Sequence, residues 1–362
     1  MASLRVVAMS WMNQDRTVRA AVMAVGFGAV VMVSASAAKP QPLAPMDTKI
    51  YERPNRLVAV EGRRRLNLLC MGSGSPTVVL EAGAGIGAYG WRKVQGEIAK
   101  FTRACSYDRA GYGFSDPIAH PADATNAVKD LHALLEHAGI TGPVVLVAHS
   151  VGGLYSELFS ATFPDEVGGM VLVDPTGLDD FRLVLDVISD DERQQQHASF
   201  LKRMARYGRC LDLAQRGEPL GPPTSDCLPA PTGDADKDRL LRLQFGQAKY
   251  FEALQSEMTG FFPANYPSGA ESVITAQVRR HPFTFGQKPL ILLTTPGKGP
   301  PGERGARLTA STDAEAQQLA RSSTRGKLVK VESGHAIQDD HPDVVIGAVR
   351  EVVAAVRGSP PS

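Results

Sequence analysis

The chain has 362 residues, of which 43% are hydrophobic, and its 39 basic and 38 acidic side chains leave a formal net charge of +1. This length and apolar content allow a large folded core and exclude a disordered chain or a bundle of membrane helices. The balanced charge provides no strong field that would recruit nucleic acid or an anionic surface. We therefore expect a small-molecule partner and no nucleic-acid partner.

The N-terminal segment has the layout of a secretory signal peptide. Arg16 and Arg19 precede the apolar residues 20–33, and the small residues Ser34-Ala-Ser-Ala-Ala38 follow. The apolar stretch is shorter than the roughly 20 residues that cross a bilayer as a helix, and the small residues suit a signal peptidase. We expect residues 1–38 to be removed and the protein to be exported, to the periplasm or the extracellular space, without stable membrane association. A membrane anchor formed by an uncleaved N-terminal segment is the alternative.

Export to an oxidising compartment would allow the four cysteines to form disulfides. Cys210 and Cys227 flank a short proline-containing segment, which predicts a loop closed at its base by a disulfide. Cys70 and Cys105 each lie near a predicted strand, which favours a second bridge between neighbouring strands. The sequence has no close group of Cys and His residues that would predict a metal site, and it predicts no cofactor.

Short apolar, β-branched runs alternate with longer helical stretches, which is typical of an α/β fold with a mostly parallel sheet and helices on both faces. Several runs lack alternation, as expected for strands that are buried on both faces. The predicted strands cover residues 65–70, 77–80, 104–107, 144–147, 170–173, 290–293 and 328–331. Apolar residues at helical spacing predict a helix before Gly139 and a closing helix through residues 345–356.

From about Gly177 to Lys288 the strand pattern disappears and charged, helical sequence takes over. We interpret residues 177–288 as a helical cap inserted into a core of residues 50–176 and 289–358. Eleven of the chain's 23 aromatic residues fall in this stretch. Some of them would form the cap's own core, but as a group they favour an apolar roof over an active site.

Ser150 ends the apolar run Val144-Val-Leu-Val-Ala-His149 and is followed by small residues. A strand that turns sharply into a helix holds a serine in a strained conformation with its hydroxyl exposed, and such a turn needs small neighbours. Gly152 and Gly153 meet this need. The usual Gly-x-Ser-x-Gly pattern has a glycine two positions before the serine, where this chain has Ala148. The pattern predicts that Ser150 is a nucleophile.

Five segments, in the same order, resemble motifs of the α/β-hydrolase superfamily, and the likeness extends from about Arg56 to Arg357. These segments are Val78-Val-Leu-Glu-Ala-Gly-Ala-Gly85, Ser106-Tyr-Asp-Arg-Ala-Gly-Tyr-Gly-Phe-Ser-Asp116, the Ser150 turn, Val171-Leu-Val-Asp-Pro175 and Glu332-Ser-Gly-His335. The resemblance implies an α/β-hydrolase fold with an inserted helical cap. It also implies that the backbone N–H groups of Val151 and Ala84 form an oxyanion hole.

A serine hydroxyl attacks a carbonyl effectively when a base takes its proton, and a histidine oriented by a carboxylate can serve as that base. His335 lies in a short loop between the last predicted strand and the closing helix, which predicts that it is the base. We expect His149 to point away, because neighbouring side chains at a sharp turn diverge. Two acids obey the order serine, acid, histidine: Asp174 at a strand end and Glu303 in a loop rich in proline and glycine. A strand-end carboxylate is held more rigidly, which favours Asp174 and leaves Glu303 as the alternative.

These residues predict an exported serine hydrolase that cleaves a carboxylic ester of a small, largely apolar substrate through an acyl-serine intermediate. An amidase or peptidase with the same three residues is one alternative. A binding protein that has kept the fold and lost catalysis is an alternative of another class. Epoxide hydrolases and dehalogenases of the superfamily generally carry an aspartate where this chain has Ser150, which argues against both of those reactions.

Overall fold

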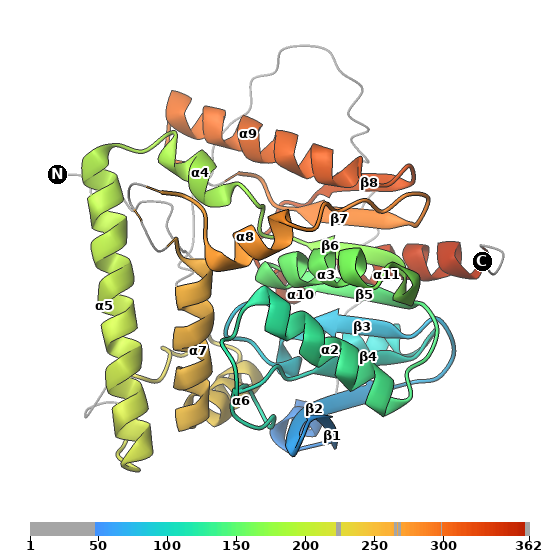
Figure 1. Cartoon of the computed structure of the whole chain (residues 1–362), viewed down its shortest axis with the longest axis horizontal. Helices are drawn as coiled ribbons and strands as arrows, with labels where there is room; N and C mark the ends of the chain where they lie inside the picture. The colour runs from blue at the N-terminus through green and yellow to red at the C-terminus, as the bar shows by residue number, and fades with distance from the viewer. Residues whose placement is uncertain (1–47, 222–225, 264–265, 267–268, 298, 359–362) are drawn as a thin grey trace.

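The computed structural model describes residues 48–358 except 222–225, 264–265, 267–268 and 298. Its centre is an eight-stranded sheet with the strand order β1-β2-β4-β3-β5-β6-β7-β8 (Figure 1). β2 runs antiparallel to β1 and β4, and every other pair of neighbours in this sheet is parallel. The predicted α/β fold with a mostly parallel sheet is confirmed. The predicted signal peptide, residues 1–38, lies outside the described residues.

The strands are β1 (Arg56–Glu61), β2 (Arg64–Met71), β3 (Val78–Glu81), β4 (Ala104–Tyr107), β5 (Val144–His149), β6 (Val167–Val173), β7 (Leu290–Thr294) and β8 (Gly326–Lys330). The α-helices are α1 (Gln95–Ile98), α2 (Ala124–Ala138), α3 (Val151–Thr162), α4 (Asp180–Leu185), α5 (Asp190–Gln215), α6 (Ala235–Phe245), α7 (Ala248–Phe261), α8 (Val273–Arg279), α9 (Glu303–Ala320), α10 (Ile337–Asp340) and α11 (Pro342–Arg357). Short 3-10 helices are η1 (Thr48–Glu52), η2 (Ala88–Trp91) and η3 (Pro164–Glu166).

The two edge strands differ most from the sequence-based expectation. β1 is not among the predicted strands, because its residues alternate between exposed and buried positions and do not form an apolar run. β8 begins and ends earlier than the predicted segment 328–331, and most of its residues are partly or fully exposed. An edge strand has a neighbour on one side only, so its sequence is less strongly constrained to be apolar.

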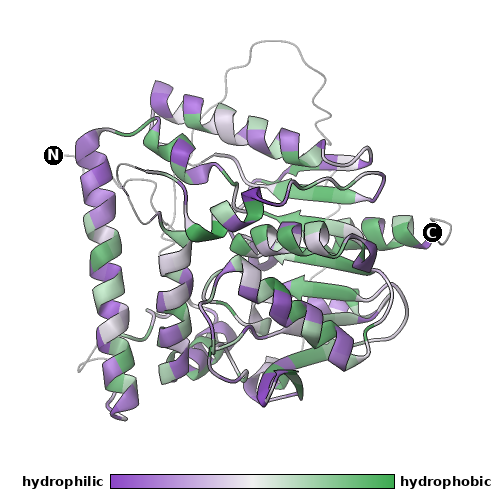
Figure 2. Cartoon of the chain, in the orientation of Figure 1, coloured by the Kyte–Doolittle hydropathy of each residue, from purple (hydrophilic) through white to green (hydrophobic). Residues whose placement is uncertain are grey.

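Helices cover both faces of the sheet. Apolar residues of α2, α3 and α8 join one core cluster, and those of α1 and α11 join another on the opposite face. Successive residues of β5 alternate between the two, with Val144, Leu146 and Ala148 in the first cluster and Val145 and Val147 in the second. Because both faces are buried, β5 reads as an uninterrupted apolar run. Figure 2 shows the central strands as the most continuous hydrophobic part of the molecule.

The segment between β6 and β7 contains the helices α4 to α8, and we call its residues 177–288 the cap segment. The long helix α5 packs beside α7 at one end of the sheet (Figure 1), and its residues are largely hydrophilic (Figure 2). Eight aromatic side chains among the described residues of the cap segment are buried: Tyr207, Phe245, Tyr250, Phe251, Phe261, Phe262, Tyr266 and Phe285. Several contact one another, such as Phe245 and Tyr250 with ring centroids 4.4 Å apart. These aromatics therefore contribute to the packing of the cap segment itself.

All four cysteines lie within the described residues. Both predicted disulfides are present, Cys70–Cys105 and Cys210–Cys227. The first joins directly opposed positions of β2 and β4, and the second ties the end of α5 to the segment that follows it. None of the helices within the described ranges combines the length and apolar content that a bilayer crossing requires.

Candidate active site

Ser150 lies at the sharp turn between β5 and α3. Its φ of 61° and ψ of −131° are unusual for a residue with a side chain, and such a conformation costs on the order of 1–3 kcal/mol. Hydrogen bonds hold the turn on both sides. The Ser150 N–H donates to the oxygen of Val173 at 3.2 Å, and its carbonyl accepts from Gly153 at 2.8 Å and Thr176 at 3.1 Å. The structure thus contains the strained turn that the sequence predicts.

The two glycines after Ser150 allow close packing of the turn. A Cβ atom on Gly152 would lie 2.7 Å from the carbonyl oxygen of Ala82, and one on Gly153 would lie 2.9 Å from Cβ of Pro175. Ala148 stands where the usual pattern has the first glycine, and its side chain is fully buried in the apolar core. The packing of the sheet therefore accommodates the extra methyl group.

Asp174 and His335 meet at the carboxyl edge of the sheet. The Nδ1 atom of His335 lies 2.6 Å from Oδ2 of Asp174. Thr295, the first residue after β7, holds the same carboxylate, with its N–H 2.9 Å from Oδ1 and its hydroxyl 3.1 Å from both oxygens. Burial acts to raise the pKa of Asp174, but the hydrogen bonds and charge of His335 and the bonds from Thr295 outweigh burial and lower it. A charged carboxylate in this place keeps the proton of the imidazole on Nδ1.

Glu303, the alternative acid, does not lie in a loop as the sequence suggests. It is the first residue of α9, and it is exposed. The run rich in proline and glycine ends at Gly302, whose φ of 85° is one that residues with side chains rarely adopt. A glutamate in the first turn of a helix interacts favourably with the helix dipole, which accounts for Glu303 without a catalytic role. The geometry therefore favours Asp174 as the acid that partners His335.

His149 does not point away from the site, and this expectation is wrong. Its Nε2 atom lies 3.0 Å from the backbone oxygen of His335, and the centroids of the two rings are 4.5 Å apart. Burial and the neighbouring imidazole of His335 lower the pKa of His149 to about 3. The ring is therefore neutral near pH 7, and its Nε2–H donates to the carbonyl. The local turn does not reveal this contact, because the loop that carries His335 reaches the end of β5 only in the folded chain.

The residues expected to form the oxyanion hole lie beside Ser150. Val151 is the first residue of α3, so its N–H has no acceptor within the helix. Ala84 lies in the loop after β3. Its neighbour Gly83 packs so closely that an added Cβ atom would lie 3.1 Å from Cβ of Ser150. Backbone N–H groups at these two positions can stabilise an oxygen that gains negative charge when the serine attacks a carbonyl.

The sequence analysis missed a buried ion cluster next to this loop. Arg109 forms ion pairs with Glu81 at 2.6 Å and with Glu257 at 2.9 Å, and both carboxylate side chains are 1% exposed. Burial acts to lower the pKa of Arg109, but Glu257 and Glu81 outweigh it and raise the pKa above its usual value. The sequence does hold a signal for Glu81, because this glutamate ends the otherwise apolar strand β3 and is therefore expected to be buried. The sequence carries no comparable signal for Glu257, which α7 brings from the cap segment.

A family model matches residues 78–348, a range that includes Ser150, Asp174 and His335, and its description is "Alpha/beta hydrolase family". The chain belongs to this family. The membership confirms the resemblance inferred from the five motifs, and the sheet described above is the one expected for an α/β hydrolase.

Curated proteins align with parts of this α/β hydrolase. It is 35% identical over 104 residues to the uncharacterized protein YqjL of Bacillus subtilis, which covers 29% of this chain and 41% of YqjL. It is 41% identical over 81 residues to the lipase LipV of Mycobacterium tuberculosis, which covers 22% of this chain and 30% of LipV. The first three curated relatives are aligned over 14%, 41% and 37% of their own length, less than half in each case.

Solved structures with the same fold match most of the chain. The crystal structure of DBJA has a TM-score of 0.60 at 19% sequence identity and covers 85% of this chain and 100% of its own. The ancestral haloalkane dehalogenase AncHLD2 has a TM-score of 0.60 at 18% identity and covers 84% of this chain and 100% of its own. At these identities the likeness concerns the fold alone.

Proposed function

We propose that this α/β hydrolase is an exported serine hydrolase that cleaves carboxylic esters. Ser150 is the nucleophile, His335 the general base and Asp174 the acid that orients the histidine. The observation that carries the proposal is the 2.6 Å contact between Asp174 and Nδ1 of His335, at the sheet edge where the strained turn presents Ser150.

The reaction would proceed in two steps. Nε2 of His335 takes the proton of Ser150 as the hydroxyl oxygen attacks the ester carbonyl carbon, and the N–H groups of Val151 and Ala84 stabilise the negative oxygen. Protonated His335 then donates its proton to the leaving alcohol, and an acyl-serine remains. His335 takes a proton from water as the water attacks this second ester, and it then gives that proton to the departing Oγ of Ser150 as the acid is released. Asp174 stays charged throughout and stabilises the imidazolium.

Serine chemistry distinguishes this proposal from the reaction named for the dehalogenases of the same fold. Attack by Ser150 on a carbon–halogen bond would leave an ether, which a general base and water do not cleave readily. Attack on an ester leaves another ester, which the same groups hydrolyse. The partial similarity to a protein named as a lipase also supports an ester substrate.

The surroundings of Ser150 favour a small, largely apolar substrate. Ser150 is 2% exposed, so little space is open above it. Tyr250 and Leu254 of α7 lie close to Gly85 in the loop after β3. A Cβ atom added to Gly85 would lie 3.3 Å from the hydroxyl of Tyr250 and 3.1 Å from Cδ1 of Leu254. An enclosed site with such neighbours favours short apolar acyl groups over bulky or charged ones.

A fluorophosphonate probe tests the proposal. Folded wild-type protein is expected to carry one adduct, located by mass spectrometry on Ser150, and to hydrolyse p-nitrophenyl acetate and butyrate. The Ser150→Ala variant is expected to show neither. Absence of labelling and hydrolysis in folded wild-type protein would overturn the proposal in favour of a binding protein. Faster hydrolysis of matched p-nitroanilides than of the esters would identify an amidase.

Export has a separate test. Full-length protein produced in a bacterial host is expected in the periplasmic fraction, with an intact mass that corresponds to cleavage near Ala38. Full-length mass in the membrane fraction would contradict cleavage and support an uncleaved anchor.

A further inference from the structure

Arg109 holds the loop that carries Ala84 from one side. Its Nη1 donates to the carbonyl oxygen of Ala82 at 2.6 Å, and its Nη2 donates to the carbonyl oxygen of Gly83 at 2.8 Å. The guanidinium plane thus spans two successive carbonyls of the loop. A planar, forked cation suits such paired acceptors better than a single ammonium group does.

The bond to Gly83 also sets the direction of the Ala84 N–H, because that carbonyl and that N–H belong to one peptide group. A trans peptide group is planar, and its C=O and N–H point in opposite directions. Since Arg109 draws the carbonyl of Gly83 towards itself, the N–H of Ala84 points away from Arg109. A cation bound to the carbonyl also polarises the peptide group and makes its N–H a stronger donor.

The cap segment holds the same loop from the other side of Ala84. The N–H of Gly85 donates to Oε2 of Glu257 at 2.9 Å, and the carbonyl of Gly85 accepts from Nε2 of Gln244 at 2.6 Å. Glu257 lies on α7 and Gln244 on α6. The peptide groups on both sides of Ala84 are therefore fixed by named side chains.

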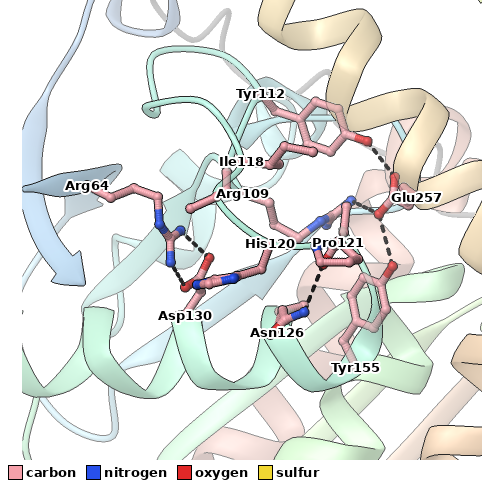
Figure 3. A pocket seen from close by; sticks show the side chains of 14 residues that line it. Arg64, Arg109, Tyr112, Ile118, His120, Pro121, Asn126, Asp130, Tyr155 and Glu257 are labelled. Carbon is pink, nitrogen blue, oxygen red and sulfur yellow. Dashed lines mark hydrogen bonds and ion pairs between the residues drawn. The ribbon is translucent and has the colours of Figure 1, made fainter. Parts of the chain in front are cut away.

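Glu257 links these two sets of contacts. Its Oε1 accepts from Arg109 at 2.9 Å, and the hydroxyls of Tyr112 and Tyr155 donate to its carboxylate at 2.7 Å and 3.0 Å. Figure 3 shows the two tyrosines and Arg109 converging on Glu257. Glu81 binds the other arm of the guanidinium at 2.6 Å. Two carboxylates on separate elements therefore fix the orientation of Arg109.

We propose that Arg109 is a positioning residue for the oxyanion hole, and that Glu257 makes this positioning depend on the docking of α7. Arg109 does not touch the substrate; it directs the N–H of Ala84. Because Glu257 binds both Arg109 and Gly85, the oxyanion hole is complete only when the cap helix is in place. The inference rests on the proposed function for its effect on catalysis, but the geometry of the loop can be tested by itself.

The Arg109→Lys variant is the main test. Lysine keeps the positive charge that Glu81 and Glu257 require, but its ammonium group lacks the fork that spans the carbonyls of Ala82 and Gly83. Loss of one oxyanion donor lowers kcat by roughly 100- to 1,000-fold, so a misdirected donor is expected to lower kcat for p-nitrophenyl butyrate by about 30-fold, with KM within about twofold.

Arg64→Lys is the matched control. Arg64 lines the same small pocket as Arg109 (Figure 3) and binds Asp130 through two contacts of 2.5 and 2.6 Å. Its partners lie outside the loop of residues 82–85, so kcat is expected to stay within about twofold of wild type. An equal loss of kcat in both variants would contradict a specific role of Arg109.

The amide signal of Ala84 provides a readout that needs no turnover. Protein labelled with ¹⁵N-alanine gives this signal in a two-dimensional NMR spectrum, and an Ala84→Ser sample assigns it. We expect the signal to shift in Arg109→Lys and in Glu257→Gln, which removes the charge that orients Arg109, and to stay in place in Arg64→Lys. If Arg109→Lys does not fold, kcat and the Ala84 signal of Glu257→Gln test the proposal in its place.

The outcomes separate the two proposals. A fall in kcat with an unmoved Ala84 signal would overturn the positioning role, and so would a moved signal with wild-type kcat. If folded wild-type protein neither hydrolyses esters nor reacts with the fluorophosphonate probe while the Ala84 signal still moves in both variants, the proposed function fails and the control of the loop by Arg109 stands. If the signal also stays in place, both proposals fail.

Discussion

Asp174 and His335 are 161 residues apart in the chain, yet Oδ2 of Asp174 lies 2.6 Å from Nδ1 of His335. They meet because parallel strands end at one edge of the sheet. Ser150 follows β5, Asp174 follows β6, Thr295 follows β7, and the loop with His335 comes after β8. Residues that follow neighbouring parallel strands converge at the carboxyl edge, where α/β proteins place their sites.

Asp174→Asn is expected to lower kcat for an ester such as p-nitrophenyl butyrate by about 10,000-fold with little change in KM, since the amide no longer holds the imidazole in the required tautomer. Steady-state kinetics and a thermal melt of the same sample measure activity and folding together. Glu303→Gln is the control, and its kcat should match wild type because Glu303 is exposed on α9. Near wild-type turnover in Asp174→Asn would show that another acid serves His335.

His149 is expected to make the folded protein less stable in acid. Its pKa is about 3 in the folded protein and 6.5 in the unfolded chain, so between these values the unfolded chain binds a proton that the folded protein does not. The free energy of unfolding therefore falls as the pH decreases through this window, and is unaffected by this group above it. At pH 5 the loss is about 2 kcal/mol.

The His149→Gln variant tests this expectation. Denaturant unfolding at pH 7.5 and pH 5 should show a loss of stability that is smaller than in wild type by about 2 kcal/mol. The exposed His281 offers a matched control for the exchange of histidine for glutamine at a surface position. The same loss of stability in wild type and His149→Gln would contradict the prediction.

Glu157 on α3 has the opposite effect on the pH dependence. Burial, and then the charge of Glu315, raise its pKa from 4.5 to about 8. The folded protein keeps a proton that the unfolded chain releases, so the free energy of unfolding falls as the pH rises from about 4.5 to about 8. Glu157→Gln removes this effect and is expected to be more stable than wild type by about 2 kcal/mol at pH 6, and equally stable near pH 4.

Denaturant unfolding across this pH range measures the difference, with Glu136→Gln, an exposed position on α2, as control. A stability difference between Glu157→Gln and wild type that does not grow with pH would show that Glu157 is not held protonated. Asp180, whose pKa burial and Glu315 raise to about 7, adds to the wild-type trend in the same direction.

The disulfide between Cys210 and Cys227 spans 17 residues of sequence. Closing a loop of this size stabilises a folded protein by about 3 kcal/mol, because it restricts the unfolded chain. The double variant Cys210→Ser/Cys227→Ser is therefore expected to lose about this much free energy of unfolding in denaturant titrations without reductant. Equal stability of the double variant and oxidised wild type would contradict the prediction, whereas reductant should destabilise wild type further, since it also opens Cys70–Cys105.

Much of the fold could be predicted from the sequence because buried parallel strands form apolar runs that can be recognised locally. β5 and β6 are apolar on both faces, so their sequences lack alternation. The edge strand β1 alternates between exposed and buried residues and has no such apolar run. The sharp turn at Ser150 could also be predicted, since its close contacts with Ala82 and Pro175 require glycine at positions 152 and 153.

Contacts between residues far apart in the chain could not be predicted from the sequence. Asp174 and Glu303 both lie between Ser150 and His335 in the chain, so their order along the sequence does not show which of them partners the histidine. The choice depends on which carboxylate the sheet places next to His335. Glu257 was missed for the same reason, because it contacts Arg109 across 148 residues of chain.

Local sequence was enough to predict the class of fold, the sharp turn at Ser150 and the loop position of His335, since each depends on the backbone needs of a few neighbouring residues. Three contacts could be described only from the folded chain: Asp174 with His335, His149 with His335, and Arg109 with Glu81 and Glu257 beside the loop of Ala84. These are interactions between charged or polar groups brought together from distant segments. Their partners and their degree of burial exist only once the chain has folded.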